Sequence, residues 1–439
     1  MKGVIHSLFE QLEENKIPYA VLRNYETLPE KPLLGSDVDI LIDEKNQKAY
    51  KDILNKVVEN NKVFILSKKY HFNCLSYFVY QKTPFCFSSW IDAFTKIATK
   101  SFVWVDSNFL LKNRIHCEKD FYILSLGAEA AILFLKEILA GFPVKEKYRL
   151  RIRELVKEDP RSFNQVLSTH FGQKITKELL EISLNRKWEE AFKKRRELWK
   201  ILILNTIYHQ PIEQISHFFR FLWEYMKEYF RFQKGISIAF IGPDGVGKTT
   251  ISQGIKNKFK KFPFKKIYYY HGQFGFFPEL SKIYNFLSFK KKNSSPYPTE
   301  KNLPNKFRAL LHLFYYGLED FLSWPWFLWG RIRGKIFLFD RYFYDFVATS
   351  IHRQIPLWLF FTISKFIPHP DLTFIIFARP GEIYRRKKEW PIEELEKQLQ
   401  AFQSPQLLKL SKCILINNER PLEENLDKIE DEILKSLAI

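Results

Sequence analysis

Hydrophobic and polar residues alternate in three different ways along the chain, and each pattern predicts a different kind of segment. Residues 1–118 carry short apolar and aromatic runs between turn-rich stretches, which is typical of strands with a few helices. Residues 119–234 carry apolar side chains three or four positions apart, which predicts helices. Over residues 235–439, short buried-strand runs alternate with helical stretches. We therefore predict an N-terminal α+β domain, a helical connector domain and a C-terminal doubly wound α/β domain with a parallel sheet.

The same periods predict the individual elements. In the first segment we expect a helix at 4–14 and strands at 19–22, 38–42, 63–66, 74–80 and 85–91. In the second we expect helices at 121–140, 175–184, 188–208 and 212–232. In the third we expect strands at 236–241, 266–270, 335–339, 372–377 and 413–417, a helix at 251–260 and a loop at 290–304.

A glycine-rich run lies directly between the expected strand 236–241 and the expected helix 251–260. Its sequence, Gly-Pro-Asp-Gly-Val-Gly-Lys-Thr-Thr, has the spacing GxxxxGK[ST] of a phosphate-binding loop. The glycines allow backbone N–H groups to point at a phosphate, the lysine adds a cation, and the first threonine hydroxyl is a ligand for Mg²⁺. ATP and Mg²⁺ are therefore the expected cofactors, bound by Gly242, Asp244, Gly245, Val246, Gly247, Lys248, Thr249 and Thr250.

This loop resembles the form Gly-x-Asp-Gly-x-Gly-Lys-Thr-Thr found in thymidylate kinases. The sequence Asp340-Arg341-Tyr342 after the expected strand 335–339 is similar to that family's Asp-Arg-Tyr signature. The resemblance implies that Asp340 holds Mg²⁺ through water and that Arg341 clamps an anionic acceptor. It also identifies the stretch 379–388 as a lid, where Arg385 or Arg386 neutralises transition-state charge. The alternative for these two arginines is a solvated basic helix face.

The chain departs from thymidylate kinases at the expected acceptor site. The family's Arg-Glu-Pro element is replaced by Tyr-Tyr-Tyr-His-Gly-Gln-Phe at 268–274, and an aromatic stretch follows Tyr342. The acceptor is therefore expected to be a nucleotide or a sugar-type small molecule, with thymidylate a poor substrate. We predict an aromatic acceptor pocket lined by Tyr269, Tyr270, His271, Tyr342 and Tyr344.

Paired carboxylates mark a second candidate site near the N-terminus. Gly-Ser-Asp-Val-Asp-Ile-Leu-Ile at 35–42 resembles the metal-binding strand of polymerase-β-type nucleotidyltransferases. Asp37 and Asp39 are two apart on an expected strand and share one face, and Asp92 is the natural third carboxylate. That family carries its Gly-Ser pair some ten residues earlier, where this chain has Arg23. Either Arg23 takes over a phosphate contact, or the domain has kept binding and lost catalysis.

The order of these parts resembles bacterial proteins found with surface-polysaccharide genes, which implies sugar or glycan chemistry. The net charge of +20 favours anionic partners such as nucleotides, nucleic acid or acidic membrane, although a basic proteome is an alternative explanation.

The four cysteines show no metal spacing, the N-terminus turns polar too soon for a signal peptide, and no apolar run is long enough to span a bilayer. We therefore expect a cytoplasmic protein, either free or peripheral to a membrane; the sequence does not predict an oligomeric state.

Aromatic residues, 17% of the chain, are concentrated in the expected helix 212–232 and in the stretch 321–329. Between residues 217 and 232 most polar residues form one narrow stripe, and nearly all others are Phe, Leu, Trp, Tyr or Met. So wide an apolar face predicts packing against other helices, with insertion into a membrane interface as the alternative. The stretch 321–329 carries the same ambiguity, or lines the acceptor pocket near Asp340.

Three functions compete. The leading hypothesis is a two-headed enzyme, with an ATP/Mg²⁺ phosphotransferase at the C-terminus and a nucleotidyltransferase-like N-terminal domain. The second hypothesis keeps both sites but takes the end of a nucleic acid as the substrate. The positive charge of the protein would then contact the phosphate backbone of that nucleic acid. The third is a membrane-peripheral scaffold with a nucleotide switch and no turnover.

Overall fold

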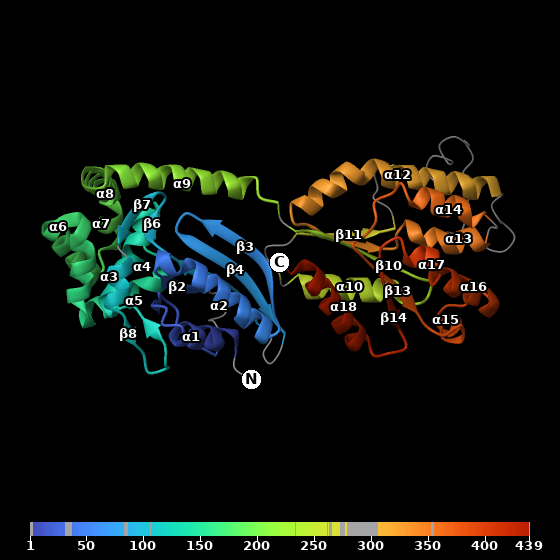
Figure 1. Ribbon diagram of the computed structural model, residues 1–439, viewed down its shortest axis with the longest axis horizontal. Coiled ribbons are helices and arrows are strands. Elements are labelled where there is room, and N and C mark those ends of the chain that lie inside the picture. The colour runs from blue at the N-terminus through green and yellow to red at the C-terminus, as the bar shows by residue number, and fades with distance from the viewer. Residues whose placement is uncertain are drawn as a thin grey trace. The chain divides into compact units, whose positions relative to one another are not determined.

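The chain folds into two compact units, residues 1–231 and residues 232–437, in a computed structural model (Figure 1). The structure describes residues 3–30, 37–82, 87–105, 107–232, 234–260, 262, 266–272, 277–278, 306–352 and 355–438. Gly35, Ser36, Phe85, Phe274 and the expected loop 290–304 lie outside the described residues.

The first unit contains a seven-stranded mixed sheet in the order β3-β4-β5-β2-β1-β9-β8. Its strands are β1 (Tyr19–Val21), β2 (Val38–Ile42), β3 (Val63–His71), β4 (Cys74–Gln81), β5 (Phe87–Phe94), β8 (Ile115–His116) and β9 (Tyr122–Ile123). A small second sheet pairs β6 (Ile97–Thr99) with β7 (Phe102–Val105). Two helices, α1 (Val4–Glu14) and α2 (Gln47–Asn60), share a hydrophobic core with one face of the large sheet. A short 3₁₀ helix, η1 (Glu44–Asn46), and α3 (Ser107–Lys112) complete this part.

Helices cover the other face of this sheet. They are α4 (Leu126–Leu139), α5 (Glu146–Glu158), α6 (Pro160–Leu184), α7 (Trp188–Lys193), α8 (Arg195–His209) and α9 (Pro211–Tyr229). Ala20 and Leu41 of the sheet belong to the same core as α4 to α8. Because these strands carry apolar residues on both faces, the sheet needs a cover on each side. The helical segment therefore lies in the same compact unit as the N-terminal sheet.

The second unit contains a five-stranded sheet in the order β11-β12-β10-β13-β14, and every neighbouring pair is parallel. The strands are β10 (Ile236–Ile241), β11 (Ile267–His271), β12 (Ile336–Asp340), β13 (Leu372–Phe377) and β14 (Lys412–Asn417). Each expected strand of this segment is found, and the central strands β10, β12 and β13 are buried on both faces, which explains their continuous apolar runs.

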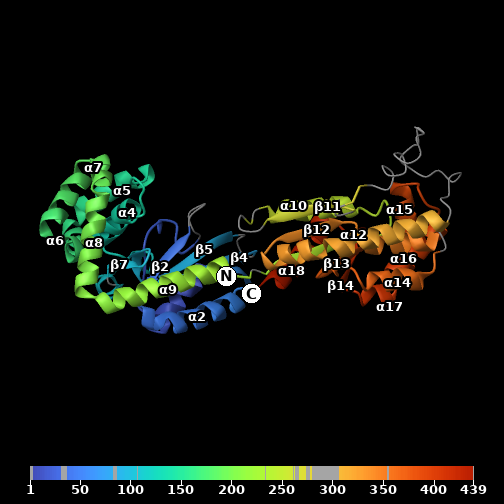
Figure 2. The ribbon, with the colours of Figure 1, turned by 90° about the horizontal axis from the view of Figure 1, so that it is seen from above.

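Helices lie on both faces of the parallel sheet (Figures 1 and 2). They are α10 (Lys248–Phe259), α12 (Lys306–Ile332), α13 (Phe346–His352), α14 (Leu357–Ser364), α15 (Pro380–Arg386), α16 (Ile392–Phe402), α17 (Pro405–Leu408) and α18 (Leu422–Leu437), with a 3₁₀ helix η3 (Phe343–Asp345). Ala239 and Ile241 of β10 pack with α12 in one core. The intervening Ile238 and Phe240 are also buried and point to the opposite face, where α10 packs on α18. The mixed α/β class predicted from the sequence is confirmed.

The orientation of α9 differs from the predicted packing. Its polar stripe faces the protein: His217 Nε2 lies 3.1 Å from Lys96 Nζ, and Arg220 forms a 2.7 Å ion pair with Glu44. The apolar residues point outward, and Gln214 is the one buried side chain of this helix. The apolar face of α9 is therefore exposed, because the contacts with the sheet are made by polar groups.

Over the residues that the structure describes, no helix is both long enough and apolar enough to cross a membrane.

Candidate functional site

The loop between β10 and α10 has a backbone that only glycine permits at three positions. Gly242, Gly245 and Gly247 adopt φ angles of 146°, 86° and 100°. A Cβ atom on Gly242 would lie 2.3 Å from the carbonyl oxygen of Ile376, and one on Gly247 would lie 2.4 Å from Asn418 Nδ2. Side chains are therefore excluded here, and the loop leads into the N-terminus of α10, where backbone N–H groups lack helical partners.

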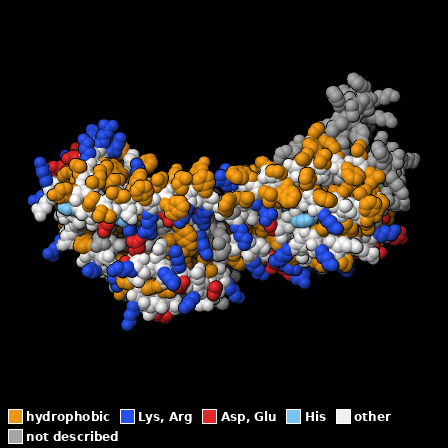
Figure 3. Space-filling view, turned by 45° about the horizontal axis from the view of Figure 1, so that its top comes forward, with side chains coloured by type: hydrophobic (Ala, Val, Ile, Leu, Met, Phe, Trp, Pro, Cys, Tyr) orange, Lys and Arg blue, Asp and Glu red, His pale blue; other side chains and the backbone are white. Residues whose placement is uncertain are grey.

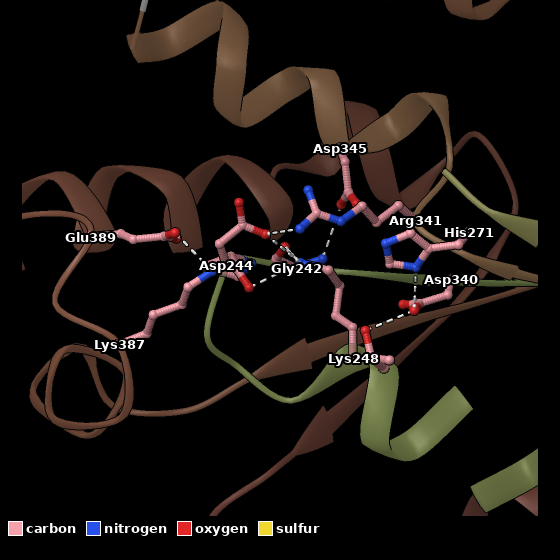
Figure 4. Close-up of polar contacts among 11 residues, drawn as sticks. Gly242, Asp244, Lys248, His271, Asp340, Arg341, Asp345, Lys387 and Glu389 are labelled. Carbon is pink, nitrogen blue, oxygen red and sulfur yellow. Dashed lines mark hydrogen bonds and ion pairs between the residues drawn. The ribbon is translucent and has the colours of Figure 1, made fainter. Parts of the chain in front are cut away.

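Lys248 lies inside this loop. Its side chain is 5% exposed, and its Nζ donates hydrogen bonds to the carbonyl oxygens of Gly242 (2.5 Å) and Pro243 (3.0 Å). It also forms a 3.3 Å ion pair with Asp244. The ammonium thus lies at the centre of the loop, close to the backbone that surrounds it (Figure 4).

Asp340 lies at the end of β12, next to the loop. Its Oδ2 accepts hydrogen bonds from the hydroxyls of Thr249 (2.7 Å) and Tyr269 (3.0 Å), and His271 Nδ1 lies 2.8 Å from the same atom. Its Oδ1 is buried and has no hydrogen-bond partner among the described residues. The cluster therefore presents one carboxylate oxygen without a partner beside a threonine hydroxyl.

Arg341 adopts a left-handed backbone conformation, with a φ of 81°, that is uncommon for a residue with a side chain. Its guanidinium lies 2.7 Å from Asp244 Oδ1. Burial would raise the pKa of Asp244, but the charges of Lys248 and Arg341 outweigh burial and hold this pKa below its ordinary value. An ionised Asp244 therefore joins the two cations on one side of the loop (Figure 4).

Two residues that the sequence did not single out hold the loop in place. Asp345 accepts a 3.1 Å hydrogen bond from the N–H of Gly242, and Asn418 Nδ2 donates a 2.7 Å bond to the carbonyl oxygen of Val246. Burial raises the pKa of Asp345 to about 6, although Lys248 and Arg341 act to lower it. A carboxylate five residues after Asp340 was the available signal for Asp345. No sequence motif surrounds Asn418, so no signal in the sequence pointed to its contact with the loop.

The expected lid residues divide between two environments. Arg386 Nη2 donates a 3.1 Å hydrogen bond to the carbonyl oxygen of Asn418, which places it beside the loop. Arg385 is 77% exposed and ion-pairs with Glu382 one helical turn away. The structure therefore brings Arg386 to the site, and Arg385 has the solvated position of a surface residue.

The predicted aromatic acceptor pocket is wrong for three of its five residues. Tyr342 and Tyr344 are buried in the core, where their hydroxyls bond the carbonyl oxygen of Pro368 and His369 Nδ1. Tyr270 stacks on Phe337 and Phe339 of the neighbouring strand. Only Tyr269 and His271 contact Asp340, because aromatic residues near the ends of these strands mostly fill the space between the sheet and α12. Within 321–329, Phe327 is buried in that same core, whereas Phe321, Trp324 and Trp329 are exposed.

In the first unit, the three expected carboxylates meet on the side of the sheet that faces α4 and α5. Asp39 lies opposite Asp92 in the parallel pairing of β2 with β5, and Asp37 comes two residues before Asp39. Asp39 is buried and hydrogen-bonded to the guanidinium of Arg23, which also donates a 3.2 Å bond to the Tyr148 hydroxyl. Asp92 Oδ1 is buried without a partner in the described part of the chain.

Cations accompany these carboxylates. Besides Arg23, α4 contributes Lys136, whose pKa is lowered by burial and by the Arg23 charge despite the attraction of Asp39. Among the described residues, no group of three or more His, Cys, Asp or Glu side chains has the geometry to hold a metal. The assignment of Asp37, Asp39 and Asp92 as metal ligands stays a prediction.

Replacing Asp92 with Asn should stabilise the first unit at pH 7.5. Burial raises the pKa of Asp92 to about 6 from an ordinary value of 3.8. The charges of Asp39 and Asp37 act in the same direction, and a hydrogen bond with Ser76 opposes them. The ionised form therefore opposes folding above pH 6, by up to about 3 kcal/mol, and this cost fades as the pH falls towards 4. Thermal unfolding of Asp92→Asn should show a higher Tm than wild type at pH 7.5 and a smaller gain at pH 5.

The exposed Asp52→Asn provides the matched control, with little change in Tm at either pH. A lower Tm for Asp92→Asn at pH 7.5 would show that the buried carboxylate is a stabilising group and that this explanation of its environment is incorrect.

The sequence matches no protein-family model, and a search of the curated proteins finds no match. A function for this chain therefore rests on its own residues: the glycine loop around Lys248 in one unit, and the carboxylates on β2 and β5 in the other.

Proposed function

We propose that the second unit is an ATP- and Mg²⁺-dependent phosphotransferase of the P-loop kinase type, similar to thymidylate kinases. The observation that carries this proposal is the loop itself. A Cβ at Gly242 would lie 2.3 Å from a backbone oxygen, Gly245 and Gly247 adopt positive φ angles that favour glycine, and the buried ammonium of Lys248 lies among the loop carbonyls. A loop of this shape, between a central parallel strand and a helix N-terminus, suits a phosphate chain.

In this proposal Lys248 changes partners when a nucleotide binds. The carbonyls of Gly242 and Pro243 that it contacts are neutral, whereas phosphate oxygens carry negative charge and add an ion-pair attraction to the hydrogen bond. The backbone N–H groups at the start of α10 add donors to the same anion. Lys248 therefore binds and orients the phosphates.

The residues beside the loop fit a Mg²⁺ ion. Thr249 offers a hydroxyl and Asp340 offers Oδ1, a buried oxygen without a partner among the described residues, and Mg²⁺ prefers such oxygen ligands. When bound, Mg²⁺ supplies positive charge that neutralises the phosphate oxygens. Thr249 and Asp340 would hold it, and Tyr269 and His271 keep the Asp340 carboxylate in its orientation.

In this proposal the arginines near the loop bind the transferred phosphoryl group and the acceptor. The loop carries no arginine, so Arg341 and Arg386 are the guanidinium groups available near it. Arg341 is held at the site by Asp244 and can turn to an anionic or hydroxylated acceptor. We propose a nucleotide or a sugar-type small molecule as that acceptor, with a link to surface-polysaccharide chemistry.

Thymidylate should be a poor substrate. The last residue of β11 and the three positions after it read His271-Gly-Gln-Phe, without the arginine and carboxylate of the Arg-Glu-Pro element that holds the nucleotide in thymidylate kinases. Steady-state rates at fixed Mg·ATP should therefore be higher for a phosphorylated or free sugar than for thymidylate. Efficient thymidylate phosphorylation, with kcat/KM of about 10⁴ M⁻¹s⁻¹ or more, would make the second unit a plain thymidylate kinase.

For the first unit we propose a nucleotidyltransferase-like domain. The parallel register places Asp39 opposite Asp92, and Arg23 and Lys136 supply cations that a nucleotide phosphate requires. Catalysis requires Asp39 to exchange Arg23 for a metal, whereas a binding module would keep the ion pair. Incubation with each nucleoside triphosphate, followed by measurement of released pyrophosphate, distinguishes a catalytic domain from a binding module.

A nucleic-acid end as the substrate is the alternative that the net charge of +20 favours. A true polynucleotide binder loses affinity steeply as salt increases, since it releases counterions from the phosphate backbone. Weak, salt-insensitive binding of single- and double-stranded oligonucleotides would favour the small-molecule acceptor. Turnover of ATP with any acceptor would exclude a switch without catalysis.

A further inference from the structure

We propose that the outward apolar faces of α9 and α12 dock this protein on the surface of a bilayer that contains acidic lipids. Figure 3 shows hydrophobic side chains gathered over α9 in the first unit and over α12 in the second. Each face is considered within its own unit.

The polar contacts of α9 fix which side of the helix faces outward. Gln214 Nε2 donates a 3.2 Å hydrogen bond to Ser101 Oγ, and the bond is buried. One and two turns further along, the contacts of His217 with Lys96 and of Arg220 with Glu44 hold the same side of the helix against the sheet. A surface helix of a soluble protein normally does the reverse and buries its apolar stripe.

The outward face of α9 and the residues after it are large and aromatic. Phe219 is 63% exposed and Trp223 is 62% exposed. The whole face comprises Ile212, Ile215, Phe218, Phe219, Leu222, Trp223, Tyr225, Met226, Tyr229, Phe230 and Phe232. A continuous apolar surface of this kind marks an interaction site, because scattered apolar residues do not follow one helix face for its full length.

Helix α12 repeats the arrangement in the second unit. One side packs into the core through Ala309, Leu313 and Phe327. Away from this side the helix exposes Leu311, Phe314, Leu318, Phe321, Leu322, Trp324, Leu328, Trp329 and Ile332. Leu311, Phe314 and Leu318, and then Leu322, Trp329 and Ile332, are three, four or seven residues apart, which is the helical period, so most of the exposed residues share one broad face of α12.

The composition of both faces favours a membrane surface. Trp and Tyr concentrate at membrane–water interfaces, where the ring lies among the acyl chains and the polar atom reaches the headgroups. Neither helix can cross a bilayer, so each would lie in the interface plane with its apolar face down. A bilayer accepts the two faces independently, whereas one protein partner would have to match both surfaces at once.

Positive charge at the edges of these faces favours acidic lipids. Lys227 Nζ lies 5.3 Å from the centre of the Trp223 ring, and the Arg333 guanidinium lies 4.8 Å from the centre of the Trp329 ring. The net charge of the chain is +20. Cations beside interfacial aromatic rings are attracted to phosphate and carboxylate headgroups, and each adds to the affinity for an anionic leaflet.

Vesicle co-flotation of the full chain tests this proposal. Wild-type protein should float with vesicles of phosphatidylcholine and phosphatidylserine and less with phosphatidylcholine alone. The double variant Phe219→Ser/Trp223→Ser should bind acidic vesicles at least about tenfold more weakly, because two exposed rings no longer leave water on binding. Phe321→Ser/Trp329→Ser should act in the same direction through α12.

Phe142→Ser is the matched control, since Phe142 is also 61% exposed but lies on neither face. It should bind acidic vesicles as wild type does, and all variants should keep the wild-type Tm. The proposal is overturned if wild type does not float, or if the double variants float as well as wild type. A wild type that forms dimers without lipid, and that the α9 substitutions render monomeric without any vesicle binding, would identify a second copy of the chain as the occupant.

Discussion

Lys248→Ala should abolish ATP-dependent phosphoryl transfer, with kcat lower by about a thousandfold or more. The substitution removes the ammonium that lies inside the loop, where the proposed transfer develops charge on the phosphates. Loss of a single neutral donor from such a site costs a hundredfold to a thousandfold, and a buried full charge should cost at least as much. The measurement is release of ADP in the presence of an acceptor that the wild-type enzyme uses.

Lys258→Ala is the matched control on the same helix. Its Nζ forms ion pairs with Asp427 (2.7 Å) and Glu430 (3.5 Å) of α18, away from the loop. This variant should lose some stability and keep its turnover, whereas Lys248→Ala should keep its fold and lose its turnover. Near-normal turnover in Lys248→Ala would mean that the glycine loop does not bind the phosphate donor.

Asp340→Asn should lower kcat by about a hundredfold or more and raise the Mg²⁺ concentration required for half-maximal rate. An asparagine keeps an oxygen for the Thr249 hydroxyl but removes the negative charge that a hard cation needs. The size of the effect follows from losing one charged metal ligand at the reacting phosphates. Initial rates over a Mg²⁺ titration at constant ATP measure both changes.

Asp371→Asn separates this effect from a general loss of stability. Asp371 also bonds the sheet, through Ser237 N (2.8 Å) and the Arg331 guanidinium, but it lies at the beginning of β13, at the opposite ends of the parallel strands. It should lower Tm and leave the Mg²⁺ dependence unchanged. An Asp340→Asn enzyme with the Mg²⁺ dependence of wild type would remove Asp340 from the metal site.

The parallel sheet and its loop were predictable because the residues of each segment favour the structure that the segment adopts. Strands such as β10 and β13 are apolar on both faces, and the glycines of the loop occur where their φ angles are positive. Asp340 ends β12 and Arg341 follows it, and in a parallel sheet the carboxyl ends of the strands are where ligand-binding residues collect. Sequence pattern alone therefore placed Lys248, Thr249 and Asp340 correctly at one edge.

The residues that support the loop were not predictable from pattern. Asp345 and Asn418 reach the backbone of Gly242 and Val246 from positions 103 and 172 residues away in the sequence. Their contacts depend on how strands and loops meet in three dimensions. The same holds for Tyr342 and Tyr344. An aromatic residue after a strand can line a pocket or fill a core, and here both pack in the core with hydroxyl partners at Pro368 and His369.

The face of α9 shows a further limit of periodicity. A 3.6-residue period identifies two faces of a helix, and the apolar one is normally assigned to the protein. Here the inward contacts are Gln214 with Ser101 and Arg220 with Glu44, partners that lie 113 and 176 residues apart in the chain. The close packing of the helical segment on the N-terminal sheet has a related reason: β1 and β2 are apolar on both faces, which requires helices on the second face.

Calorimetric titration of the full chain with Mg·ATP decides whether the glycine loop is a nucleotide site. We expect a Mg·ATP site that weakens markedly when Mg²⁺ is withheld, remains in Lys258→Ala and is lost in Lys248→Ala. Mg·ATP that binds equally well to Lys248→Ala and wild type, or that does not bind wild type, would contradict the assignment of the glycine loop as the nucleotide site.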